Sequence, residues 1–179
     1  MVLVLSGPVH GGKTTFLERS LPRWTARGVS CAGFLSPAVT AADGEKGYDL
    51  LELKEGRRRP YLRRQGEPGA ERTGPFVFVP AALDLARSII READARELLV
   101  VDEVGPLELQ GGGLWPALRE TVGRPERRIL LVAREEILED LAAVLAPVVP
   151  LVFDIRDPDV QELLDENLLG TVKPDDGQS

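Results

Sequence analysis

The chain has 179 residues, 43% of them hydrophobic and 28% charged, which is the size and composition of a globular protein with one sizeable core. Its formal net charge of −7 argues against a general attraction for nucleic acid or for an anionic membrane. A single cysteine, Cys31, excludes an internal disulfide, and one cysteine with one histidine argue against a zinc site.

The chain opens on a predicted strand, Met1–Leu5, followed by a glycine-rich loop and a helix over Lys13–Arg27. The loop reads GxxxxGKT over residues 7–14, which is the P-loop (Walker A) pattern in the strand–loop–helix context that it requires. Its glycines let successive N–H groups point inward at phosphate oxygens, and the helix N-terminus adds partial positive charge. Lys13 would reach the β- and γ-phosphates, and the Thr14 hydroxyl would ligate Mg²⁺.

The first helix and the strand after it are bounded by proline and glycine. Pro22 lies inside the helical pattern and is expected to bend or interrupt it, and Gly28 is expected to end it. A second strand is predicted over Cys31–Ser36, stopped by Pro37, and we expect Cys31 to be a core thiol within it.

Residues 38–75 differ in character from the rest of the chain. Strands are predicted over Lys46–Lys54 and Arg57–Arg64, with the turn signal Glu55-Gly56 between them and another turn over 41–45. This segment therefore predicts a β-hairpin excursion from the core rather than a separate domain.

Strands and helices alternate along the remaining chain. Strands are predicted over 76–79, 97–101, 129–133 and 148–153, and helices over 81–95, 114–122, 135–145 and 158–169. The loop 105–113 shows no regular pattern. The alternation predicts an α/β three-layer sandwich, with helices on both faces of a mostly parallel sheet. We expect one domain over residues 1–170, with the hairpin at 38–75 and a disordered polar tail at 171–179.

A second motif is the apolar strand Leu98–Val101, which runs into Asp102 and Glu103. This is the form of a Walker B strand, in which the aspartate holds Mg²⁺ through water opposite Thr14. A carboxylate beside the metal aspartate can orient the attacking water, so Glu103 is the candidate base; the alternative is a solvent-facing or structural carboxylate. A glutamate at this position also indicates that another strand separates the two motif strands, as in RecA-like folds.

With these motifs the chain resembles the small P-loop nucleoside-triphosphatase family that includes the cancer-related nucleoside-triphosphatase. The likeness covers residues 1–155 and rests on GPVHGGKTT at 7–15, on GFLSP at 33–37 with GYDL at 47–50, and on DEVGPLEL at 102–109. The last stretch is the most diagnostic, because generic Walker B strands do not continue into Gly-x-x-Glu-Leu.

The resemblance implies a P-loop NTPase fold and Mg²⁺-dependent hydrolysis of ATP, GTP and other nucleoside triphosphates with broad base tolerance. It also implies two groups of nucleotide-contacting residues. They are Gly7, Pro8, Val9, His10, Gly11, Gly12, Lys13, Thr14 and Thr15 in the loop, and Val101, Asp102, Glu103, Val104 and Gly105 after the second strand.

Phosphoryl transfer depends mostly on positioning and charge stabilisation, so a cation beyond Lys13 would help. Arg134 follows a predicted strand at the edge where open α/β sheets bind ligands, and with Lys13 and Glu103 it completes the candidate catalytic set. His10 either shapes access to the γ-phosphate or is a tolerated loop residue. The hairpin adds arginines whose alternative role is a solvated sheet edge: Arg57, Arg58, Arg59, Arg63 and Arg64.

Three functions remain open from the sequence. The leading one is a nucleoside-triphosphatase with Mg²⁺ as cofactor. The alternatives are a small-molecule or nucleotide kinase, which needs a second pocket and a lid that excludes water, and a nucleotide-dependent switch or accessory protein with slow hydrolysis.

We expect no nucleic-acid or membrane partner, while any protein partner is unknown. With no recognisable signal peptide or transmembrane-length run, we expect a cytoplasmic protein.

Overall fold

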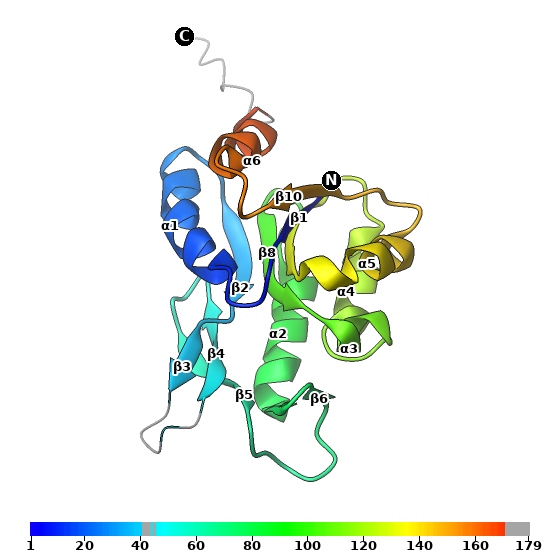
Figure 1. Cartoon of the computed structure of the whole chain (residues 1–179). Coiled ribbons are helices and arrows are strands. Elements are labelled where there is room, and N and C mark those ends of the chain that lie inside the picture. Colours follow the sequence, from blue (N-terminus) through cyan, green and yellow to red (C-terminus); the bar gives the residue numbers. More distant parts are fainter. Residues whose placement is uncertain (41–43, 45, 171–179) are drawn as a thin grey trace.

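Five parallel strands form the centre of the fold among the described residues, which are 1–40, 44 and 46–170 of a computed structural model. Their order is β10–β1–β9–β8–β2 (Figure 1). Because β9 lies between β1 and β8, one strand separates the P-loop strand from the strand that carries Asp102, and the RecA-like order is confirmed. The strand bounds are β1 (Val2–Ser6), β2 (Cys31–Leu35), β8 (Leu98–Val104), β9 (Arg128–Ala133) and β10 (Leu151–Asp154).

The sheet continues beyond β2 as antiparallel strands. β4 pairs with β2 on one side and with β5 on the other; β7 and then β6 follow β5, and β3 pairs with β4. These strands extend the central sheet instead of forming a layer of their own. Two short strands, β3 and β6, had no sequence signal. Residues 41–43 and 45 of the predicted turn lie outside the described residues. The bounds are β3 (Ala38–Thr40), β4 (Lys46–Glu52), β5 (Arg58–Arg63), β6 (Arg72–Thr73) and β7 (Phe76–Phe78).

Helices cover both faces of the parallel sheet, as the alternating pattern predicted. On one face, α1 (Lys13–Ala26) and α6 (Val160–Leu169) bring Trp24 and Leu164 against Leu3 and Leu5 of β1. On the other, α2 (Pro80–Glu92), α4 (Trp115–Val122) and α5 (Leu138–Leu145) cover Val4. Successive β1 residues therefore enter opposite cores, which explains the uninterrupted apolar run.

None of the helices formed by the described residues has the length and apolar character needed to cross a membrane. The tail predicted over 171–179 lies outside the described part of the chain.

The elements differ from the sequence prediction at several points. α1 runs through Pro22 without interruption, because this residue is exposed and the carbonyl that loses its N–H partner can be solvated. β8 does not stop before Asp102 but continues to Val104, which pairs with Ala133 of β9. The loop 105–113 contains a short helix, α3 (Pro106–Leu109), and a 3₁₀ turn, η1 (Glu135–Ile137), precedes α5. Cys31 is only partly buried at the start of β2.

The pairing of β2 with β8 depends on a residue without a side chain at position 33. Gly33 has φ +110°, and a Cβ atom there would lie 1.9 Å from the carbonyl oxygen of its strand partner Val100. Neither the backbone conformation nor this close approach suits any other residue.

We therefore predict that Gly33→Ala lowers the free energy of unfolding by about 2–4 kcal/mol, through backbone strain and overpacking. Urea denaturation followed by circular dichroism measures the loss. The matched control is Gly123→Ala, because Gly123 is exposed, has φ −74° and has open space around its Cβ position. Equal stability of the two variants would contradict the prediction.

Candidate functional site

The loop between β1 and α1 curls around the side chain of Lys13. Gly7, His10 and Gly12 have φ values of +150°, +59° and +82°, so the backbone turns sharply three times in six residues. The Lys13 ammonium donates to the carbonyl oxygens of Gly7 at 2.9 Å and of Pro8 at 2.8 Å. Burial lowers the pKa of Lys13, and the nearby carboxylates of Glu103 and Asp102 oppose that effect. The backbone of the P-loop thus holds the Lys13 ammonium at the start of α1, where helix N-termini commonly bind phosphate.

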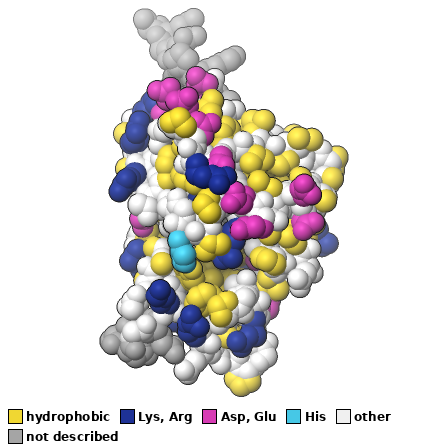
Figure 2. All heavy atoms as spheres, in the orientation of Figure 1, with side chains coloured by type: hydrophobic (Ala, Val, Ile, Leu, Met, Phe, Trp, Pro, Cys, Tyr) yellow, Lys and Arg dark blue, Asp and Glu magenta, His cyan; other side chains and the backbone are white. Residues whose placement is uncertain are grey.

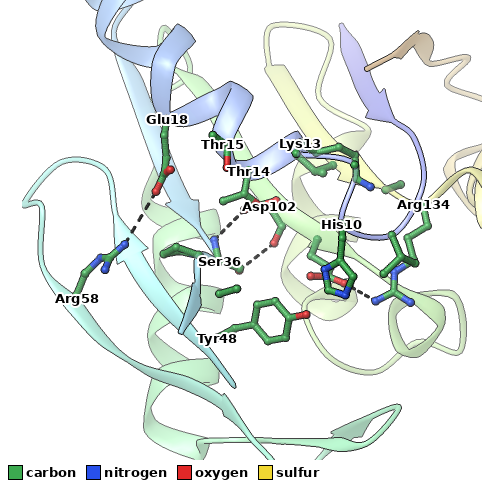
Figure 3. A pocket seen from close by; sticks show the side chains of 18 residues that line it. His10, Lys13, Thr14, Thr15, Glu18, Ser36, Tyr48, Arg58, Asp102 and Arg134 are labelled. Carbon is green, nitrogen blue, oxygen red and sulfur yellow. Dashed lines mark hydrogen bonds and ion pairs between the residues drawn. The ribbon is translucent and has the colours of Figure 1, made fainter. Parts of the chain in front are cut away.

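The Asp102 carboxylate joins three parts of the fold at the carboxyl edge of the sheet. Its Oδ2 atom accepts the Thr14 hydroxyl at 2.8 Å and the Ser36 N–H at 2.8 Å, while the Ser36 hydroxyl donates to the Asp102 carbonyl at 3.2 Å (Figure 3). Asp102 is 2% exposed. Burial raises the pKa of Asp102 to about 6, although these two hydrogen bonds and Lys13 favour the charged form.

Thr14 and Asp102 form an oxygen pair that suits a hard divalent cation. Mg²⁺ prefers oxygen ligands and retains several waters, so one hydroxyl, one carboxylate and substrate phosphates suffice to hold it. The part of the chain that the structure describes contains no group of three or more His, Cys, Asp or Glu residues able to hold a metal. The Thr14 and Asp102 oxygens fit Mg²⁺ that is also held by water and by phosphate oxygens.

A bulge in β8 directs Asp102 and Glu103 into the same pocket. Val101 pairs with Leu131 and Val104 with Ala133, so β8 has one residue more than β9 across this step. Glu103 occupies the bulge with φ +72°, a conformation that few residues other than glycine adopt. In a regular strand, neighbouring side chains would point to opposite faces, and the bulge removes that alternation.

Glu103 forms an ion pair with Arg134, which directly follows β9. The Arg134 Nη2 atom donates to Glu103 Oε1 at 2.8 Å, and the two side chains are 40% and 33% exposed. Both residues thus meet at the mouth of the site, as expected for side chains at the carboxyl ends of neighbouring parallel strands.

These side chains surround a pocket of about 490 Å³. The predicted site residues that line it are Val9, His10, Gly11, Gly12, Lys13, Thr14, Thr15, Asp102, Glu103 and Arg134. Gly7 and Pro8 contribute the carbonyls that hold Lys13, whereas Val101 and Val104 are buried in the core. Gly105 lines a smaller adjoining pocket. Figure 2 shows His10, the single histidine, on the face of the molecule that Figure 1 presents, with basic side chains gathered below it.

The hairpin arginines divide between the pocket and structural contacts. Arg58 lines the pocket, with its guanidinium 4.0 Å from Glu18. Arg63 instead donates to Asp49 at 2.6 Å and so braces β4 against β5. The remaining three lie elsewhere: Arg57 pairs with Glu55, Arg64 lies over the ring of Phe76, and Arg59 does not line the pocket.

Several pocket residues were not singled out from the sequence. Ser36 and Tyr48 belong to the GFLSP and GYDL stretches, but their role depends on β2 lying beside β8 and β4, which no local signal reveals. Glu18 lies one turn beyond the P-loop on α1. Burial raises the pKa of Tyr48, with Glu103 adding to the effect.

Glu108 explains the Gly-x-x-Glu-Leu run in structural terms. Its two carboxylate oxygens accept the N–H groups of Gly105 at 2.9 Å and of Leu114 at 3.0 Å, and the side chain is 3% exposed. Burial raises the pKa of Glu108, and these hydrogen bonds act against the rise. The residue therefore fixes the loop after β8, which borders the smaller pocket at Gly105.

Comparison with known proteins gives consistent matches. A family model described as NTPase matches residues 2–163. The chain is 30% identical to the nucleoside-triphosphatase THEP1 of Methanopyrus kandleri over 143 residues, 78% of each chain. It is 30% identical to the human cancer-related nucleoside-triphosphatase over 136 residues, 70% of this chain and 71% of the human one.

Two solved structures share the fold. The solution structure of a human cancer-related nucleoside triphosphatase superimposes with a TM-score of 0.71 and 26% identity, covering 96% of this chain and 98% of the other. The crystal structure of THEP1 from the hyperthermophile Aquifex aeolicus gives a TM-score of 0.71 at 19% identity, covering 92% and 98%.

The buried charge of Asp102 leads to a stability prediction. Its folded-state pKa of about 6 lies above the ordinary value of 3.8, so the ionised carboxylate weakens folding above pH 6 and this penalty disappears as the pH falls toward 4. Asp102→Asn keeps an oxygen acceptor without the charge, so in the presence of chelator it should raise the free energy of unfolding at pH 8 by about 1–3 kcal/mol.

Urea denaturation at pH 8 and pH 5 tests this prediction. The gain of the Asn variant over the wild type should shrink at the lower pH. Asp84→Asn is the matched control, because Asp84 is exposed on α2 and should show no comparable gain. A less stable Asp102→Asn protein at pH 8 would overturn the interpretation.

Proposed function

The chain belongs to the NTPase family, and from that premise we propose that it is an Mg²⁺-dependent nucleoside-triphosphatase that converts ATP, GTP and other nucleoside triphosphates to the diphosphate and phosphate. The observation that carries the proposal is the convergence of Lys13, Thr14, Asp102 and Glu103 on one pocket. They supply a phosphate-binding cation, an oxygen pair for the metal and a carboxylate for the attacking water.

The P-loop is the binding element of this proposal. The N–H groups of residues 9–15 and the start of α1 take the phosphates, and Lys13 exchanges the carbonyl oxygens of Gly7 and Pro8 for the β- and γ-phosphate oxygens. Mg²⁺, held by Thr14 and Asp102, would neutralise the charge of the β- and γ-phosphates. The protein contribution is thus mostly positioning and electrostatic stabilisation.

Glu103 is the group we assign to the water. Its carboxylate lines the pocket beside Asp102, and the bulge that gives it φ +72° is the kind of backbone strain that accumulates at functional sites. It orients the attacking water toward the γ-phosphorus and accepts its proton.

Arg134 is the second cation of the proposed site. In the structure its guanidinium is paired with Glu103. A γ-phosphate carries more negative charge than one carboxylate, so we propose that Arg134 turns toward it when nucleotide binds. The same movement releases Glu103 for its water, which couples substrate binding to formation of the base.

Hydrolysis is favoured over the switch alternative because Glu103, a carboxylate that can orient water and accept its proton, lines the proposed nucleotide pocket. The kinase alternative requires a second pocket for the acceptor beside the phosphate site.

Substitution of the two residues tests their roles. Glu103→Gln should bind Mg-ATP normally but release phosphate about 10²–10⁴-fold more slowly, since it cannot take the proton. Arg134→Ala should lower kcat by roughly 10²-fold or more with a smaller effect on KM, since it loses charge stabilisation in the transition state. A coupled phosphate-release assay and equilibrium nucleotide binding measure these effects.

Arg119→Ala provides the matched control, because Arg119 is exposed on α4 and does not line the pocket. Turnover within twofold of the wild type in both test variants would remove Glu103 and Arg134 from the mechanism.

A further inference from the structure

A second pocket of about 140 Å³ adjoins the nucleotide pocket. Its lining includes Thr73, Pro75 and Phe76 of the hairpin formed by β6 and β7. The buried residues Tyr61 and Glu108 line it as well. No residue of the P-loop lines it. It is therefore a separate compartment and not an extension of the phosphate-binding loop.

Four residues line both pockets: Ser36, Tyr48, Glu103 and Arg134. The ion pair between Glu103 and Arg134 thus stands at the boundary between them. A molecule in the second pocket would approach the same carboxylate that lines the phosphate site. In the proposed function this carboxylate orients the attacking nucleophile, so a hydroxyl beside it could take the place of water.

The walls of the second pocket suit a small ring. Tyr48 meets Phe76, and Tyr61 meets Phe78, both edge to face with ring centroids 5.2 Å apart. A cavity of about 150 Å³ accommodates a benzene-sized molecule, so the volume of about 140 Å³ suits one ring with a short substituent.

A buried polar group lies in the wall of this pocket, beside the aromatic rings. Tyr61 is 2% exposed, and its hydroxyl has no hydrogen-bond partner among the described residues. Glu108 presents its carboxylate nearby, already accepting two backbone N–H groups. Buried polar groups normally have a hydrogen-bond partner. A ligand with a polar atom in this pocket would supply one for the Tyr61 hydroxyl.

We propose that this pocket binds a small ring-containing alcohol and that the protein transfers the γ-phosphoryl group of a nucleoside triphosphate to its hydroxyl. The alcohol oxygen bonds to the γ-phosphorus, and the bond from that phosphorus to the β–γ bridging oxygen breaks with its electron pair. The hydroxyl proton passes to Glu103. The products are a phosphate monoester and the nucleoside diphosphate, and water takes the place of the alcohol when the pocket is empty.

This inference rests on the proposed nucleotide site but needs a different readout. The full-length protein is incubated with Mg-ATP and, separately, with benzyl alcohol, furfuryl alcohol or cyclohexylmethanol. Mass spectrometry and ³¹P NMR then detect the corresponding phosphate monoester. At least one alcohol should give its ester while release of inorganic phosphate falls. Toluene, which has the ring without the hydroxyl, should lower phosphate release and give no ester.

Substitutions that fill the second pocket test whether ester formation takes place there. Thr73→Phe and Pro75→Phe each place a ring in the second pocket, so ester formation should fall by about tenfold or more because the hydroxyl is no longer held near the phosphorus. Thr40→Phe is the matched control, since Thr40 is exposed on β3 and lines neither pocket. Circular dichroism verifies that each variant is folded.

The outcomes separate the two proposals. If ATP is hydrolysed but no alcohol forms an ester, the acceptor site is overturned and the nucleoside-triphosphatase stands. An ester whose yield is the same in Thr73→Phe, Pro75→Phe and the wild type would also overturn the assignment to this pocket. If the protein neither binds nor hydrolyses Mg-ATP, the proposed function fails first.

Discussion

The buried carboxylate of Asp102 is the interaction on which the rest of the site depends. One oxygen accepts both the Thr14 hydroxyl and the Ser36 N–H, so a single atom joins the P-loop helix, the end of β2 and the end of β8. Burying that charge is unfavourable, which is why burial raises the pKa of Asp102 to about 6. The proposed Mg²⁺ would offset this cost, because a divalent cation beside Asp102 stabilises the ionised carboxylate.

Both cations of the site have hydrogen-bond partners within the protein. Lys13 is satisfied by the carbonyls of Gly7 and Pro8, and Arg134 by Glu103. A polyphosphate offers both cations stronger acceptors than they have, while metal binding offers Asp102 a stronger partner than the Thr14 hydroxyl. In the proposed mechanism, nucleotide binding exchanges these internal contacts for substrate contacts and frees the Glu103 carboxylate to accept a proton from water.

Much of the candidate site could be predicted from the sequence, because short motifs of neighbouring residues define it. The P-loop and the apolar strand before Asp102 carry their own signals, and the position of Glu103 correctly indicated a strand between the two motif strands. Ser36 could not be assigned in the same way, since its contact with Asp102 arises from pairing between strands that lie far apart in sequence. The bulge that turns Glu103 into the pocket is also a property of the β8–β9 pair and has no signature in β8 alone. Glu108 differs from Ser36, because the sequence motif singled it out but not its role. Its carboxylate accepts backbone N–H groups of the loop after β8 and does not line the larger pocket.

The most direct test of the account is the Mg²⁺ dependence of phosphate release from ATP, GTP, CTP and UTP in the wild type, Thr14→Ser and Thr14→Ala. If Thr14 and Asp102 hold the metal of a bound nucleotide, all four nucleotides are hydrolysed only with Mg²⁺. Thr14→Ser, which keeps the hydroxyl, stays within about tenfold of the wild type, whereas Thr14→Ala needs far more Mg²⁺. Undiminished release in chelator, or an unchanged Mg²⁺ requirement in Thr14→Ala, would contradict the central claim.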